Sequence, residues 1–278
     1  MGDYSNSIRN RIVNRGPAQG YCVICGEYGK LTRDHVPPKR CNNLNDIEIK
    51  ALMSDENSDK AGPTSQGGMH FKTLCGVCNS ERLGIKYDPS LVDLSNEITS
   101  LVQGAKRRNI VLPKKIYPII QPQRIARSVV GHALAAIAVD ETREGLRSSP
   151  ISDLLRYYFL DEESHMPDNL EIYYWLYPSR KQVVIKGMGK RYLGIDGVVV
   201  GHVLKFLPLG FWIVYNKPSN ININLANLVK RKDMGLSERE QIEIDLYSAP
   251  SIKFPEAPKG WEINALNNSY AYSGHPKN

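Results

Sequence analysis

The chain has 278 residues, enough for one large domain or two modest ones. Hydrophobic residues make up 41% and charged residues 23%, which excludes a collagen-like, coiled-coil or largely disordered chain. The formal net charge of +7 makes a polyanion a more natural partner than a basic ligand.

Residues 1–19 are polar and predict a loosely held N-terminal segment. All five cysteines follow within residues 22–78, and prolines then punctuate a change of composition near residue 110. We therefore predict a first domain over residues 20–110. Within it, residues 42–68 predict an inserted surface loop, and apolar residues at helical spacing predict helices over 79–87 and 89–102.

A second domain is predicted over residues 111–267. It begins with a largely apolar helix over 124–139 and a second helix over 152–159. The period then changes to that of strands, with one hairpin predicted over 170–186, a second over 198–215 and a last strand over 242–246. Helices followed by strands predict an α+β fold class with an antiparallel sheet. Residues 268–278 predict a flexible tail, because Ser, Tyr, Gly and Pro dominate them.

The positive charge is concentrated at the junction of the two predicted domains. No acidic residue lies between Glu97 and Asp140, whereas lysines and arginines recur there. A solvated surface and a nucleic-acid contact explain this stretch equally well.

No secretory signal or membrane span is recognisable. The longest apolar stretch, residues 197–215, is interrupted by His202, Lys205 and Pro208. We expect a soluble, cytoplasmic protein with no membrane partner, whose cysteines are free or metal-bound.

Two CxxC pairs carry the strongest chemical signal. Cys22 and Cys25 form one pair, and Cys75 and Cys78 form the other. Two such pairs are typical of a four-thiolate zinc site, and a thioredoxin-like redox pair is disfavoured because no βαβ pattern accompanies them. The fifth cysteine, Cys41, has no sequence partner and is interpreted as a buried or incidental thiol.

The segment between the pairs is much longer than the roughly 15–20 residues of a simple zinc ribbon. It contains Asp34 next to His35, and Asn79 directly follows the second pair. The order CxxC, Asp-His, CxxC-Asn resembles the HNH nuclease family, in its four-cysteine version, over about residues 20–90. The resemblance implies a zinc-stapled ββα-metal fold.

Phosphodiester hydrolysis gives these residue types a chemical reason. Asp34 and Asn79 offer oxygen ligands suited to Mg²⁺ or Mn²⁺. A histidine that is neutral near pH 7, such as His35, can act as general base toward water. Adjacent residues of an extended strand point to opposite sides, so a local bend is required for Asp34 and His35 to address one phosphate.

Other residues near the motif have weaker signals. His70 occupies the place where many family members carry the middle asparagine, which leaves its role open. His132 and His202, set in apolar runs, are interpreted as satisfied core or sheet residues. Four cations near the motif are candidates for phosphate contacts: Lys39, Arg40, Lys72 and Arg82.

The sequence thus predicts a metal-dependent HNH endonuclease with structural Zn²⁺ and catalytic Mg²⁺ or Mn²⁺, acting on nucleic acid, with DNA favoured over RNA. The alternative is a catalytically silent four-cysteine zinc module that binds nucleic acid or protein. The second domain matches no recognised pattern. It would serve substrate recognition, homo-oligomer formation or binding of a regulatory partner, as suits a prokaryotic or phage defence or mobile-element nuclease.

Overall fold

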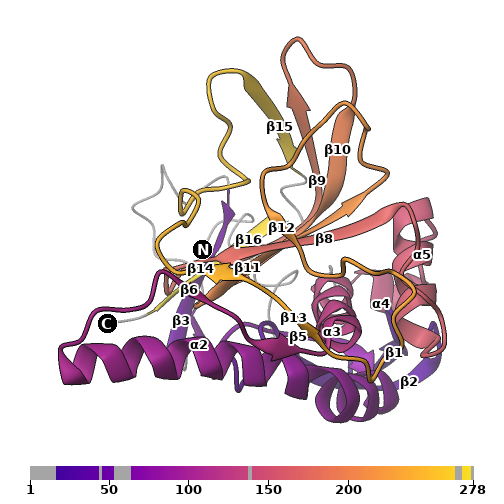
Figure 1. Cartoon of the computed structure of the whole chain (residues 1–278). Helices are drawn as coiled ribbons and strands as arrows, with labels where there is room; N and C mark the ends of the chain where they lie inside the picture. The colour runs from indigo at the N-terminus through magenta and orange to yellow at the C-terminus, as the bar shows by residue number, and fades with distance from the viewer. Residues whose placement is uncertain (1–16, 44–45, 53–63, 137–139, 267–270, 277–278) are drawn as a thin grey trace.

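The computed structural model describes residues 17–43, 46–52, 64–136, 140–266 and 271–276 (Figure 1). These residues form a mixed α/β structure with few helices and several antiparallel sheets. The predicted class, α+β with antiparallel sheets, is confirmed at that level. Within the described residues, no helix is both long and apolar enough to cross a membrane.

A small antiparallel sheet carries the first motif residues. Its strand order is β1 (Gln19–Tyr21), β2 (Tyr28–His35) and β5 (His70–Cys75). The chain then enters a wide π-type helix, η2 (Val77–Tyr87), which continues directly into α2 (Asp88–Arg108). The two predicted helices over 79–87 and 89–102 are therefore consecutive segments of one continuous helix. Its C-terminal part extends along the bottom edge of the molecule in Figure 1.

The large sheet has nine strands in the order β12-β8-β11-β10-β9-β16-β3-β4, with β15 paired to β9. Its neighbouring strands are antiparallel. The strands are β3 (Asp46–Ala51), β4 (Thr64–Gln66), β8 (Leu170–Leu176), β9 (Gln182–Tyr192), β10 (Val198–Phe206), β11 (Leu209–Tyr215), β12 (Ala226–Asn227), β15 (Glu262–Leu266) and β16 (Ala271–Pro276).

Two segments expected at the surface are strands of this sheet. The predicted inserted loop over 42–68 contains β3 and β4, and the predicted tail over 268–278 contains β16. β16 lies between β9 and β3, and Ile47 and Ile49 of β3 are fully buried. Pairing with β16 helps to bury the apolar residues of β3, and β3 in turn provides hydrogen-bond partners for the backbone of β16. Neither segment alone shows in its sequence that it belongs to this sheet. Residues 1–16 and 53–63 lie outside the described residues.

One of the two predicted hairpins is wrong and the other is confirmed. β10 and β11 pair across a tight turn in which Phe206 faces Leu209. β8 and β9 form as strands, but β8 pairs with β11 and β12, whereas β9 pairs with β10, β15 and β16. Strands β8 and β9 are thus not neighbours, because β11 and β10 lie between them in the sheet.

The helices gather on the side of the small sheet (Figure 1). α3 (Pro122–Ala135) is buried along its length, as its apolar sequence predicts, and it contacts η2, α2 and α5 (Pro150–Leu160). α4 (Asp140–Glu144) lies beside β1. Two short pairs join β6 (Lys115–Ile116) to β14 (Ile244–Asp245) and β7 (Ile119–Ile120) to β13 (Glu240–Gln241).

The buried side chains on the two sides of residue 110 form one continuous cluster. It contains Leu74 and Leu83 from the first segment, Val130 and Phe159 from the helices, and Phe211 from the large sheet. A second cluster, with Trp175 and Trp212, covers the opposite face of that sheet. The domain boundary stays a prediction, but the two segments share their hydrophobic core.

Two buried lysines hold the segment that leads into β15 against the large sheet. Lys205 of β10 donates to the backbone oxygens of Ile252 and Phe254, at 2.7 and 3.0 Å, and pairs with Glu256. Lys190 of β9 pairs with Glu262 at 2.5 Å. Because both ammonium groups are fully buried, these partners are needed to offset their lost hydration.

Candidate functional site: a four-cysteine cluster beside a polar cavity

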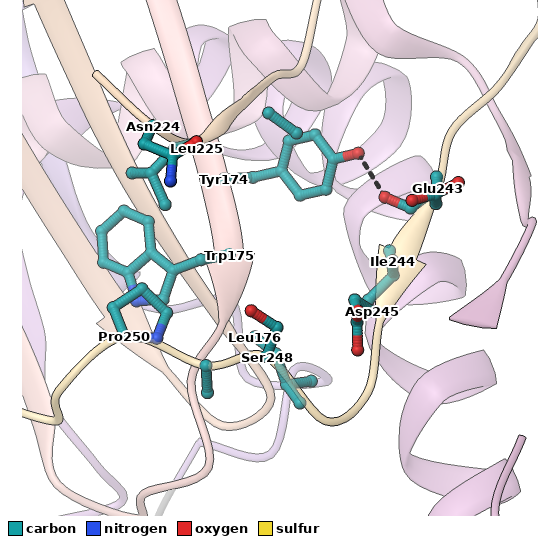
Figure 2. A pocket seen from close by; sticks show the side chains of 12 residues that line it. Tyr174, Trp175, Leu176, Asn224, Leu225, Glu243, Ile244, Asp245, Ser248 and Pro250 are labelled. Atoms are coloured by element: carbon teal, nitrogen blue, oxygen red, sulfur yellow. Dashed lines mark hydrogen bonds between the residues drawn. The ribbon is translucent and has the colours of Figure 1, made fainter. Parts of the chain in front are cut away.

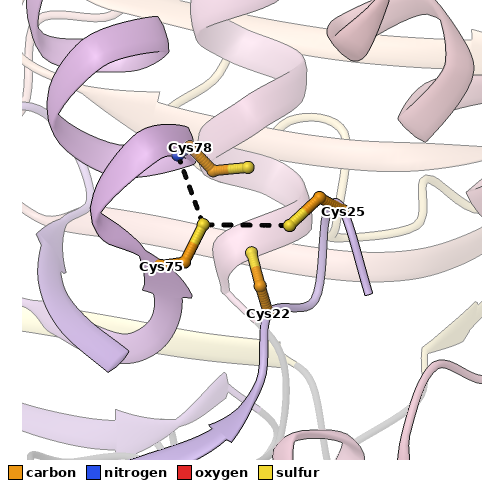
Figure 3. A group of neighbouring side chains, drawn as sticks. All are labelled: Cys22, Cys25, Cys75 and Cys78. Atoms are coloured by element: carbon orange, nitrogen blue, oxygen red, sulfur yellow. Dashed lines mark hydrogen bonds between the residues drawn. The ribbon is translucent and has the colours of Figure 1, made fainter. Parts of the chain in front are cut away.

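The two CxxC pairs meet in space as their spacing predicts. The sulfurs of Cys22, Cys25, Cys75 and Cys78 all lie within 4.8 Å of one another, and Figure 3 shows them converging between the knuckle after β1 and the start of η2. The Sγ atoms of Cys25 and Cys75 are 3.8 Å apart. Four sulfurs placed tetrahedrally at about 2.3 Å from a zinc ion would be roughly 3.8 Å apart, so the cluster fits structural zinc.

The electrostatics of the four thiols also fit a cation. The hydrogen bond from Cys25 to Cys22 raises the pKa of Cys25 to about 12. Hydrogen bonds to Cys22 and Cys25, together with burial, raise the pKa of Cys78 as well. Four thiolates therefore do not coexist here without a compensating positive charge, which a zinc ion supplies.

The turn that carries Cys22 and Cys25 is held by residues from both sides of residue 110. Gly26 closes its turn with a φ of 78°, a left-handed conformation suited to glycine, and donates to the Cys22 backbone oxygen. Val23 donates from its backbone N–H to the Thr73 oxygen of β5 and accepts from the Nε of Arg156 on α5 at 3.0 Å. The cysteine cluster is thus part of the packed interior. Cys41 is buried and lies outside it.

Asp34 and His35 lie at the end of β2, where the strand is irregular. Its pairing with β5 shifts between Thr32 and Asp34, where Arg33 lies opposite two residues of β5, Lys72 and Thr73. Such a bulge re-aims the residues beside it. Asp34 and His35 follow this bulge, and both line the same cavity.

Asn79 connects the helix to that bulge. Its side-chain nitrogen donates to Thr32 Oγ1 at 2.9 Å and to the Arg33 backbone oxygen at 2.8 Å. Both hydrogens of the amide are thereby used on β2, which leaves the carbonyl oxygen Oδ1 for a ligand. Asn79 also lines the cavity, so the three residues of the Asp-His and CxxC-Asn motifs come together.

The cavity has a volume of about 180 Å³ and a mixed lining of acids, cations and apolar groups. Burial and the nearby charge of His70 lower the pKa of His35, which keeps its imidazole neutral near pH 7. Burial raises the pKa of Asp34, although the charge and hydrogen bond of His132 oppose that effect. The remaining lining residues are Arg33, Pro38, Lys39, Arg40, Gly84, Asp88, Pro89 and Val92.

The predicted phosphate contacts divide into two groups. Lys39 and Arg40 line the cavity. Lys72 and Arg82 do not, and Arg82 instead binds the Leu160 backbone oxygen at 2.7 Å and approaches Glu162. Arg33, which the sequence did not single out, lies at the cavity as a further cation.

His70 faces His35 across the β2–β5 ladder, with ring centroids 5.6 Å apart. Its Nδ1 lies 3.0 Å from the Gly68 backbone oxygen, which makes Nδ1 the protonated nitrogen. Its Nε2 is buried with no hydrogen-bond partner among the described residues. His70 is not among the residues that line the cavity.

Two further residues belong to the site, and sequence reasoning missed their role. Asp88, the first residue of α2, lines the cavity, and His132 of α3 contacts both Asp34 and Asp88. His132 is buried, as predicted, but it is not a mere core residue. A single imidazole in an otherwise apolar buried helix was the one available signal, because such a group requires polar partners.

A larger cavity of about 490 Å³ lies at the edge of the large sheet (Figure 2). Tyr174 and Trp175 of β8 line it, together with Glu243 and with Asp245 of β14. Its lining is aromatic and acidic, whereas the smaller cavity holds Arg33, Lys39 and Arg40. The smaller cavity is therefore the better match for a phosphodiester.

The chain matches no protein-family model, no curated protein and no solved structure.

Proposed function

We propose that the protein is a metal-dependent endonuclease of the HNH type that hydrolyses phosphodiester bonds, with DNA as the favoured substrate. The observation that carries the proposal is the convergence of Asp34, His35 and Asn79 on one cavity, next to the four-cysteine cluster. The succession of β2, β5 and η2 supports a ββα-metal arrangement of this region.

The residues divide the chemical work as follows. His35, kept neutral by burial, accepts the proton of the attacking water. Asp34 and Asn79 would hold Mg²⁺ or Mn²⁺ through oxygen atoms. Such an ion, when bound, would neutralise charge on the phosphate and stabilise the leaving oxygen. Lys39 and Arg40 bind the flanking phosphates, and the zinc cluster fixes the start of η2, and with it Asn79, relative to β1 and β2.

The decisive experiment is cleavage of supercoiled plasmid DNA by the full chain and by His35→Ala, in Mg²⁺, in Mn²⁺ and in EDTA. The matched control is His165→Ala, because His165 is exposed and lies outside the cavity. We expect nicking that requires the divalent ion, yields 5′-phosphate ends and is lost in His35→Ala by at least about 100-fold. Zinc content should be equal in all three proteins.

Two outcomes would reject the proposal. Equal cleavage by the wild type and His35→Ala would exclude His35 as the base. Absence of cleavage of both DNA and RNA with either ion, with zinc still bound, would instead support a catalytically silent zinc module that binds nucleic acid or protein.

A further inference from the structure

Asp88 lies at the cavity although no motif includes it. It is the first residue of α2, and Pro89 follows it in the first turn, where proline is well tolerated. The continuous path from Asn79 through η2 into α2 places the two side chains on the same cavity wall. A second carboxylate thus lies on the cavity that contains Asp34 and Asn79.

His132 joins the two carboxylates. Its Nδ1 lies 3.0 Å from Asp34 Oδ2, and its Nε2 lies 3.0 Å from Asp88 Oδ1. Burial alone would lower the pKa of His132, but the charges of Asp34 and Asp88 outweigh this and raise the pKa to about 10. Ser128 adds a hydrogen bond of 2.7 Å to the same Oδ1 of Asp88. Both carboxylates are therefore fixed in orientation.

Each carboxylate keeps one oxygen free. Asp34 is only 3% exposed, and its Oδ1 has no hydrogen-bond partner within the part of the chain that the structure describes. The same holds for Oδ2 of Asp88, since both of its bonds use Oδ1. Neither oxygen is among the fully buried side-chain atoms that lack a partner, so both remain accessible to a cation in the cavity.

We propose that Asp88 is a ligand of the divalent cation, so that the site consists of Asp34, Asp88 and Asn79, with His132 orienting both carboxylates. This inference rests on the proposed function for the cation's role in catalysis. Two carboxylates and an amide oxygen match the ligands that Mg²⁺ and Mn²⁺ prefer. Hydrogen bonds that orient ligating carboxylates are the usual supporting shell of such a site.

The proposal also assigns a role to the second part of the chain. His132 belongs to α3, which follows residue 111, whereas Asp34 and Asp88 precede it. The region of unknown role therefore supplies the group that orients the cation ligands, in addition to sharing the core with the first region.

The test is a titration of the zinc-loaded full chain with Mn²⁺, followed by electron paramagnetic resonance, for the wild type, Asp88→Asn and Asp93→Asn. Asp93→Asn is the matched control, since Asp93 is an exposed residue of the same helix. We expect Asp88→Asn to weaken Mn²⁺ binding by about tenfold or more and Asp93→Asn to leave it unchanged. Asp88→Asn binding within threefold of wild type would overturn the proposal.

A second measurement needs no variant and so does not depend on folding of Asp88→Asn. Fe²⁺ bound in place of Mn²⁺, with ascorbate and peroxide, generates radicals that cut the backbone near the ion. Cuts near both residue 34 and residue 88 are expected, and cuts near 34 and 79 alone would overturn the proposal. Plasmid cleavage by the same samples separates the two claims. If Mn²⁺ binding depends on Asp88 but no plasmid is cleaved, the cation site is retained and the nuclease function is rejected. If plasmid is cleaved but Mn²⁺ binding does not depend on Asp88, the nuclease function is retained and Asp88 is rejected as a ligand.

Discussion

Asp34 and His132 are 98 residues apart in the sequence, yet their side chains lie 3.0 Å apart in the interior. The contact links the Asp-His motif on β2 to the buried helix α3. It places an imidazole against a carboxylate that lines the cavity. The candidate site is thus built from both predicted regions of the chain.

The cysteine cluster should be required for stability, and Cys41 should not be part of it. Cys75→Ser removes one of four converging ligands, and we expect loss of bound zinc and a fall in melting temperature on the order of 10 °C. Cys41→Ala should retain zinc and lose only about 1 kcal/mol for the deleted buried sulfur. Metal analysis and thermal unfolding test both. Full zinc content in Cys75→Ser would contradict the four-thiolate site.

The packing of α3 should tolerate no additional methyl group at Gly131. A Cβ there would lie 2.5 Å from Phe159 and 2.7 Å from Leu83, so Gly131→Ala should cost about 1–3 kcal/mol. Gly104→Ala is the control, because a Cβ at Gly104 meets nothing within 4 Å. Alanine there should stabilise α2 by about 0.5–1 kcal/mol. Chemical denaturation measures both, and equal effects of the two substitutions would contradict this packing.

The buried ion pair between Lys205 and Glu256 should be far more important than an exposed one. Lys205→Met leaves the Glu256 carboxylate and two backbone oxygens without their donor, so we expect a loss of about 3–5 kcal/mol in unfolding free energy. Lys230→Met is the matched control. The Lys230 side chain is 55% exposed and 4.0 Å from Glu240, and its replacement should cost less than about 1 kcal/mol.

Stability should fall in mild acid partly through His202. Burial and the charge of Lys186 lower the pKa of His202 to about 3, so the folded state keeps it neutral while the unfolded chain protonates it below about pH 6.5. The unfolded state then binds more protons, and stability decreases as the pH falls. His202→Asn keeps an acceptor for the Gly187 N–H but cannot titrate.

Urea unfolding of both proteins between pH 7 and pH 5 measures this contribution. The wild type should lose about 2 kcal/mol more than His202→Asn over that range, since one proton is worth about 1.4 kcal/mol per pH unit. All other titrating groups are shared, so they cancel in the difference. Parallel stability curves for the two proteins would show that His202 is not held neutral in the folded state.

Local patterns in the sequence determined several features of the protein. The two CxxC pairs predicted the cysteine cluster, because metal ligand spacing is a short-range property of the chain. The apolar run of α3 predicted a buried helix, and the two apolar stretches that flank Leu207 and Pro208 predicted the strands β10 and β11 with their tight turn. Each of these signals is contained within one segment.

Only the tertiary structure decided which segments meet. β8 and β9 formed as expected but are separated by two other strands, and β16 fills the sheet from a segment that reads as a polar tail. The bulge of β5 opposite Arg33 and the pairing of His132 with Asp34 and Asp88 cannot be seen in local sequence patterns. The physical reason is that periodicity reports how much of a segment is buried, whereas strand pairing and buried hydrogen bonds depend on partners distant in the chain.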